Sequence, residues 1–264
     1  MDLFDYMRET TKEKESPLAS RLRPTTLDEV VGQQHIIGKD KLLYRAIKAD
    51  KLSSVIFYGP PGTGKTTLAK VIANTTSAEF TQINATVAGK KDMEEVVNKA
   101  KELKGMYQKR TILFIDEIHR YKDWSKELKL MYDYHPELQV VFTGSSVLDI
   151  NKGVSDLSRR AVMYHMQGLS FREYLLLFHD MKFPVYTLED VLRHKVEIPP
   201  RFHPLQFFPD YLRQGYYPFS PENQGIHIQQ IVNLALESDI PQYAGMNVST
   251  GRKLKRLLAI IAKS

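Results

Sequence analysis

The sequence predicts an α/β fold, in which a five-stranded parallel sheet is covered by helices on both faces and is followed by a smaller helical domain. Two observations predict it. Short, uniformly apolar runs alternate with stretches of helical periodicity as far as about Gly168, which is typical of strands that are buried on both faces and joined by crossover helices. Beyond Gly168 the segments have helical spacing and are separated by Pro and Gly.

The predicted strands share a composition of mostly Val, Ile, Leu, Phe and Tyr, with polar or glycine-rich residues after them. They are Ser54–Tyr58, Phe80–Ile83, Thr111–Ile115, Gln139–Thr143 and Ala161–Tyr164. The first of them runs into Gly59-Pro60-Pro61-Gly62, so it is expected to end in a glycine-rich turn.

The predicted helices have apolar residues three and four positions apart. In the α/β part they are Leu42–Ile47, Thr66–Asn74 and Asp92–Leu103, the last opened by Asp92 and Glu95 at capping-box spacing. In the helical part they are Phe171–His179, Thr187–His194, Pro204–Gln214, Gln224–Ser238 and Ser249–Ala262.

Three parts are expected along the chain: an N-terminal arm at residues 1–25, an α/β domain at 26–168 and a helical C-terminal domain at 169–264. The arm is polar, with Lys12-Glu13-Lys14-Glu15 ahead of Pro17 and Pro24, and indicates extended chain. The last predicted helix reaches Ser264 without a C-cap, so we expect the C-terminal domain to be truncated.

The composition is that of a soluble globular protein. Hydrophobic residues make up 42% and charged residues 26%, and no apolar run approaches the roughly 20 residues of a membrane span. The N-terminus is acidic rather than basic and cysteine is absent, so a cytoplasmic location without membrane association is expected. The net charge of +6 favours either an acidic partner such as nucleic acid or an ordinary solvated surface.

A phosphate-binding loop lies between the first predicted strand and the next helix. Gly59-Pro60-Pro61-Gly62-Thr63-Gly64-Lys65-Thr66 fits G-x-x-x-x-G-K-[ST]. Such a loop turns its backbone N–H groups toward phosphates at a helix N-terminus, where the dipole favours anions. Lys65 is then expected to reach the β- and γ-phosphates of ATP, and the Thr66 hydroxyl to coordinate Mg²⁺. The α/β domain is therefore predicted to be a P-loop nucleotide-binding domain.

Two carboxylates end the predicted strand Thr111–Ile115. In Phe114-Ile115-Asp116-Glu117 they lie at the carboxyl end of a strand, beside the ligand crevice of an open α/β sheet. Asp116 is expected to hold Mg²⁺, directly or through water, and Glu117 to orient and deprotonate the attacking water. Lys65 and Glu117 are the main catalytic candidates.

Three further residues are candidates with an alternative interpretation. Thr143 and Ser145 follow the next strand, so a hydroxyl there either positions the water or senses the γ-phosphate, or belongs to an ordinary turn. Arg159 precedes the last predicted strand. It is either an arginine finger for the nucleotide of a neighbouring subunit or part of a surface arginine pair.

Residues 1–120 resemble the replication-associated recombination AAA+ ATPases, the bacterial relatives of Werner-helicase-interacting protein. The motifs are Pro17-Leu18-Ala19-Ser20-Arg21-Leu22-Arg23-Pro24, Leu27-Asp28-Glu29-Val30-Val31-Gly32-Gln33, Tyr58–Thr67 and Phe114-Ile115-Asp116-Glu117-Ile118-His119-Arg120. The resemblance implies that Val31 and Gly32 frame the adenine and that Thr67 belongs to the nucleotide site. It also implies oligomers that act on DNA near single-strand-binding protein.

Residues 121–264 resemble a different group, the prokaryotic AAA-type ATPases with a C-terminal domain of unknown function. The motifs are Asp123-Trp124-Ser125-Lys126-Glu127-Leu128-Lys129, Phe142-Thr143-Gly144-Ser145-Ser146, Asp156-Leu157-Ser158-Arg159-Arg160 and Leu169-Ser170-Phe171-Arg172-Glu173-Tyr174-Leu175. Both groups share the Asp116–Arg120 motif, so the chain is interpreted as a chimera joined there, whether natural, engineered or a product of sequence assembly. The first group's helical lid, second sensor arginine and tetramerisation domain have no counterpart.

Two functional hypotheses follow. The leading one is an AAA+ ATPase that binds ATP and Mg²⁺, hydrolyses ATP and acts in DNA replication, recombination or repair as a homo-oligomer. The alternative is an ATP-binding switch, or an incomplete chimeric ATPase, without productive DNA remodelling.

Overall fold

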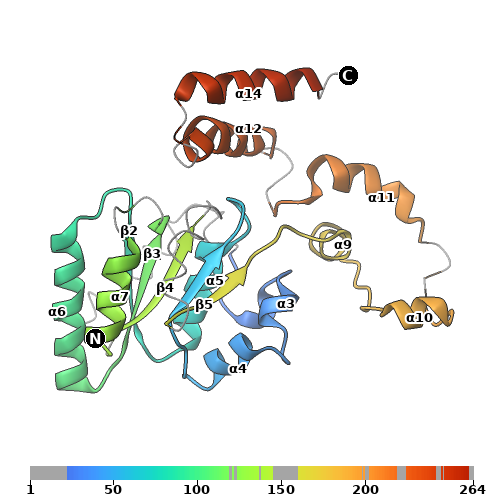
Figure 1. Ribbon diagram of the computed structural model, residues 1–264. Coiled ribbons are helices and arrows are strands. Elements are labelled where there is room, and N and C mark those ends of the chain that lie inside the picture. The colour runs from blue at the N-terminus through green and yellow to red at the C-terminus, as the bar shows by residue number, and fades with distance from the viewer. Residues whose placement is uncertain are drawn as a thin grey trace, which may run out of the picture.

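The structure of the protein is a computed structural model. It describes residues 23–118, 121, 124–136, 138–144, 160–197, 199, 202–218, 224–241, 245 and 247–261. Its strands are β1 (Val55–Tyr58), β2 (Glu79–Asn84), β3 (Thr111–Asp116), β4 (Leu138–Gly144) and β5 (Val162–His165). They form one parallel sheet in the order β2-β3-β4-β1-β5. Every strand lies where the sequence predicts it, and the predicted fold class is confirmed (Figure 1).

Helices cover both faces of the sheet (Figure 1). One face carries α3 (Gln34–Ile37), α4 (Leu42–Lys48) and α5 (Lys65–Thr75), and the other carries α6 (Lys90–Tyr107) and α7 (Trp124–Tyr134). Successive side chains of a strand point to opposite faces. Val55 and Phe57 of β1 therefore pack with the first group and Ile56 with the second, and all three are at most 1% exposed. This two-sided burial explains why the strands are uniformly apolar.

Some local features differ from the sequence prediction. Helix α6 begins at Lys90 rather than Asp92, so the prediction that Asp92 opens the helix is wrong. Asp92 is the third helical residue, and its carboxylate accepts a hydrogen bond of 2.7 Å from the backbone N–H of Gly89, as an acidic N3 residue does. Helices α3 and α7 and the 3₁₀ turn η1 (Leu27–Glu29) were not predicted.

The segment after the sheet is helical, as predicted. It contains α9 (Phe171–His179), α10 (Leu188–Leu192), α11 (Pro204–Asp210), α12 (Gln224–Leu234) and α14 (Val248–Ile261). Helices α11 and α12 each continue into a π-helical turn, η3 (Tyr211–Gly215) and η5 (Ala235–Asp239). Within the described part of the chain, no helix combines the length and the apolar character needed to cross a membrane.

Ring contacts, an ion pair and a close main-chain approach join neighbouring helices of this segment. The rings of Phe171 and Tyr174 in α9 lie 5.3 and 5.5 Å from the ring of Tyr211 at the start of η3. Helix α14 lies beside α12 and η5 (Figure 1), where the Lys255 ammonium donates to Glu237 over 3.2 Å. At Gly251 an added Cβ would lie 2.1 Å from the carbonyl oxygen of Leu236, so the two helices approach closely at this glycine.

Candidate functional site

The sheet topology brings three predicted segments together at the carboxyl ends of the strands. Strand β1 lies between β4 and β5, so the chain leaves β1 at a point where the strand order reverses. Ligands bind at such switch points, outside the carboxyl ends of the strands. In the register of the sheet Phe57 pairs with Thr143, and Asp116 ends β3 next to β4. The loop after β1 therefore lies beside the acidic end of β3.

The entrance of the loop after β1 requires glycine. Gly59 has φ of 146°, and an added Cβ would lie 2.2 Å from the carbonyl oxygen of Met166. No side chain fits there without moving the chain that follows β5. Further along the loop, the Thr63 hydroxyl donates to the carbonyl oxygen of Pro60 over 2.9 Å. Gly64 then precedes α5, so the loop ends at a helix N-terminus.

Lys65, the first residue of α5, is almost completely buried. It is 5% exposed, and its ammonium donates to the carbonyl oxygens of Gly59 and Pro60 over 2.9 and 2.8 Å. Burial lowers the pKa of Lys65 to about 8, although the charges of Glu117 and Asp116 oppose the shift. The ammonium has three N–H donors, and two of them bind carbonyl oxygens of the loop itself.

A chain of oxygen atoms joins α5, β3 and β4. The Thr66 hydroxyl lies 3.5 Å from one oxygen of Asp116, and the Thr143 hydroxyl donates to the other oxygen over 2.5 Å. Thr143 is completely buried, and its oxygen also accepts a hydrogen bond of 3.3 Å from the backbone N–H of Glu117. Hydroxyl and carboxylate oxygens are the ligands that Mg²⁺ prefers, so Thr66 and Asp116 form a suitable pair of donors.

Glu117 has a backbone conformation that is unusual for its residue type. Its φ is 53°, in the left-handed region, which is disfavoured for residues with a side chain. Backbone strain of this kind concentrates at functional sites, where the surrounding structure holds it in place. Here the Thr143 hydroxyl, which accepts from the Glu117 N–H, is one of the groups that hold it.

The other predicted site residues fall into two groups. Pro61, Gly62 and Thr67 are half-buried in the loop and in the first turn of α5, and Val31 and Gly32 lie before α3. Ser145 and Arg159 lie outside the described residues. Arg160, the neighbour of Arg159, makes a two-pronged ion pair with Asp133 on α7, with N–O distances of 2.8 and 3.1 Å.

Two residues near the loop were not identified from the sequence. The main chain of Met166 bounds Gly59, and the side chain of Gln33 binds the main chain of Gln167. Main-chain contacts leave no signal in residue type, so Met166 was not predictable. Gln33 belongs to the Val31-Gly32-Gln33 motif, but its partner is 134 residues away.

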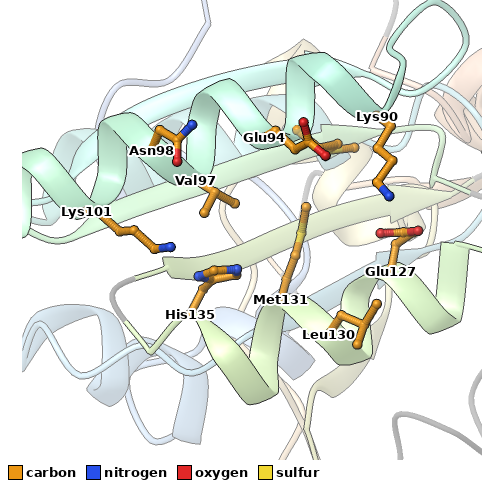
Figure 2. Close-up of a pocket in the computed structure, with 10 residues that line it drawn as sticks. Lys90, Glu94, Val97, Asn98, Lys101, Glu127, Leu130, Met131 and His135 are labelled. Atoms are coloured by element: carbon orange, nitrogen blue, oxygen red, sulfur yellow. The ribbon is translucent and has the colours of Figure 1, made fainter.

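A cavity of about 410 Å³ lies elsewhere, between α6 and α7 (Figure 2). Lys90, Glu94 and Lys101 of α6 line one side of it, and Glu127 of α7 and His135, which directly follows α7, line the other. None of the predicted site residues lines it. Its charges are mixed and its position is away from the switch point of the sheet, so the geometry favours the loop after β1 as the functional site.

Comparison with known proteins agrees with this assignment of the fold. Residues 52–175 match a protein-family model described as an AAA domain. The chain is 36% identical over 189 residues to replication-associated recombination protein A of Haemophilus influenzae, a match that covers 70% of this chain and 38% of that protein. It is 53% identical over 103 residues to the protein of the same name from Coxiella burnetii, covering 39% and 23%.

A solved structure of a RuvB mutant from Thermotoga maritima is 27% identical, with a TM-score of 0.49, over 59% of this chain and 53% of that one. The chain spans well under half the length of the curated relatives named above. The predicted resemblance to the replication-associated recombination ATPases of AAA+ type is confirmed.

Proposed function

We propose that the chain binds ATP with Mg²⁺ at Gly59–Thr66 and hydrolyses it. The match to an AAA domain and the geometry of the site support this proposal. One observation carries the proposal. The Thr66 hydroxyl, the Asp116 carboxylate and the Thr143 hydroxyl form a continuous chain of contacts beside the buried ammonium of Lys65. Enzymes that transfer phosphoryl groups use an ammonium group, a helix N-terminus and oxygen ligands for a metal ion. Here all three lie together at the carboxyl ends of the strands.

Each residue has a proposed role. The loop amides and Lys65 bind the β- and γ-phosphates, and Thr66 and Asp116 hold Mg²⁺, which would neutralise charge on the phosphates. Glu117 orients the attacking water and accepts its proton. Val31 and Gly32 frame the base. Thr143 fixes the Asp116 carboxylate and the Glu117 main chain, and Ser145 and Arg159 remain proposed contributors to water positioning and to a neighbouring subunit's site.

We further propose a link to DNA replication, recombination or repair. The similar proteins are named for replication-associated recombination, and the net charge of +6 suits a polyanionic partner. DNA, single-strand-binding protein and further copies of the chain are the proposed partners, in the cytoplasm.

We also propose the division into an arm at 1–25, a nucleotide-binding domain at 26–168 and a helical domain at 169–264. The join between two related lineages near residue 120 is a proposal too. Identity of 53% over 103 residues to one relative and of 36% over 189 residues to another is compatible with a closer match in one part of the chain. Sequencing the uninterrupted gene from genomic DNA tests the join.

The experiment measures ATP binding and turnover with and without single-stranded or forked DNA. We expect Lys65→Ala to weaken binding, and Glu117→Gln to keep binding but lower turnover by about 10²-fold or more. Lys101 and Glu94 line the cavity between α6 and α7 (Figure 2). The variants Lys101→Ala and Glu94→Gln are therefore matched controls and should behave as wild type. Turnover that is indifferent to Lys65→Ala and Glu117→Gln would contradict the proposal.

The same experiment decides between the two hypotheses. Tight binding of ATP by the wild-type chain, with hydrolysis at the uncatalysed rate, would favour an ATP-binding switch. Stimulation of turnover by DNA would favour the remodelling ATPase.

A further inference from the structure

Gln33 makes an unusual long-range contact. Its side chain is 7% exposed, and its Nε2 donates to the carbonyl oxygen of Gln167 over 2.5 Å, while the backbone N–H of Gln167 donates to its Oε1 over 3.2 Å. Both hydrogen-bonding groups of the side-chain amide are thus used on one residue, 134 positions away. We refer to this pair of hydrogen bonds as the Gln33 clamp.

On one side, the clamp holds a strained piece of main chain. Gly32 and Gln33 have φ of 88° and 56°, two consecutive left-handed residues. The side chain of Gln33 does not cap α3, although Gln33 is the N-cap residue. Its carbonyl accepts from the N–H groups of Ile36 and Ile37 over 2.8 and 3.0 Å. A left-handed conformation at a glutamine persists only where its surroundings fix it, and the clamp does so.

On the other side, the clamp holds the segment that follows β5, residues 166–169, which is itself attached to the phosphate-binding loop. The N–H of Met166 donates to the carbonyl of Tyr58 over 2.8 Å, and the carbonyl of Met166 lies against Gly59. One residue further along, Gln167 receives the clamp. Gln33 therefore connects the Gly32–Gln33 main chain to the entrance of the loop, and a hydrogen bond of 2.8 Å between the His35 ring Nε2 and the carbonyl oxygen of His165 joins the same two parts of the chain.

We propose that Gln33 is a positioning residue of the nucleotide site, an inference that rests on the proposed function. It holds the Val31–Gln33 main chain at a fixed separation from Gly59, so that the base-binding and phosphate-binding walls are arranged before the nucleotide arrives. Preorganisation strengthens binding because the ordering of the site is not left to the ligand. The side-chain amide of Gln33 forms its hydrogen bonds with Gln167 and not with Lys65, Asp116 or Glu117, so the clamp affects binding rather than the chemical step.

The test compares Gln33→Met, which removes both hydrogen bonds at similar size, with Gln34→Met, a change of the same type at the exposed neighbouring residue. Dissociation constants for a fluorescent ATP analogue, kcat and KM are measured for each. We expect Gln33→Met to raise Kd and KM about tenfold, equivalent to about 1.4 kcal/mol, with kcat within about twofold of wild type. Gln34→Met should leave all three unchanged.

A second variant, Gln33→Glu, provides a rescue by pH. The neutral acid can donate to the Gln167 carbonyl as the amide does, whereas the carboxylate cannot. Relative to wild type at each pH, we expect its Kd to be raised about tenfold near pH 8 and to approach wild type near about pH 5. This variant also serves if Gln33→Met does not fold.

The outcomes are distinct. Wild-type protein that binds no ATP would overturn the proposed function and this inference with it. Wild-type binding together with unchanged Kd and KM in both Gln33 variants, or a loss of kcat alone, would overturn the inference and leave the proposed function standing.

Discussion

The buried ammonium of Lys65 makes ATP binding depend on pH. Its pKa is lowered from 10.5 to about 8 by burial, and a bound polyphosphate would raise it again because an opposite charge favours the protonated form. Above pH 8 the free site is therefore increasingly neutral, while the bound site needs the charge. One pH unit above the pKa, at about pH 9, about a tenth of Lys65 carries its proton, so binding must take up about 0.9 proton.

Isothermal titration calorimetry measures this uptake. Titrations with Mg·ATP in buffers of different ionisation enthalpy should give close to zero proton uptake near pH 7 and about 0.9 near pH 9, with Kd rising about tenfold over that interval. The phosphates of ATP are fully ionised in this range, so the proton comes to the protein. Lys65→Arg is the control, because a guanidinium keeps its charge, and its proton uptake should stay near zero.

The same shift has a predictable effect on stability. The folded state binds the Lys65 proton less tightly than the unfolded state, so this residue's contribution to the free energy of unfolding rises with pH between about 8 and 10.5.

Two results of the calorimetry would refute the reasoning about Lys65: proton uptake near zero at pH 9 in the wild type, or equal uptake in wild type and Lys65→Arg.

Three further changes have expected outcomes. Thr143→Val removes the donor to Asp116 and the acceptor for the Glu117 N–H. The kcat should fall, and chemical denaturation should show a free energy of unfolding lower by about 1–3 kcal/mol. Thr143→Ser should restore both quantities, and equal kcat in wild type and both variants would contradict the assignment. Gln108 ends α6 with φ of 53°, so Gln108→Gly should raise the free energy of unfolding by about 1 kcal/mol, and an unchanged urea midpoint would argue against strain there. Gly251→Ala places a methyl group 2.1 Å from the Leu236 carbonyl oxygen, whereas the control Gly225→Ala adds one where nothing lies within 4 Å. Thermal unfolding should show destabilisation of about 1–3 kcal/mol for Gly251→Ala only, and both variants should bind ATP with the same affinity.

The strands were predictable because burial on both faces leaves only apolar side chains. Ile112, Leu113 and Phe114 are all fully buried, and no alternation is visible in their sequence. The loop Gly59–Thr66 was predictable for a different reason, since its residue types follow from the close approach of main chain to a ligand. Helix α7, which was not predicted, has Trp124, Leu128 and Met131 buried at helical spacing, a pattern that is visible in the sequence.

The contacts that organise the site were less accessible. The sequence placed Thr143 at the correct edge of the sheet, but its bond to Asp116 depends on the register between β3 and β4. Strand registers are set by the whole core rather than by local residues. The Gln33 clamp joins segments from opposite ends of the α/β part, and single-chain periodicity contains no information about such a pair.

The ladder between β3 and β4 also bears on how this sheet can evolve. Main-chain groups make the ladder, with Ile115 opposite Phe142, so its hydrogen bonds are compatible with the exchange of one apolar side chain for another. The apolar cluster that covers this face of β3 and β4 contains Met93 of α6 and Trp124 of α7, and it requires only apolar side chains of matching volume. Gene shuffling with breakpoints on either side of Trp124–Gly144 should therefore return folded offspring more often than breakpoints inside a strand.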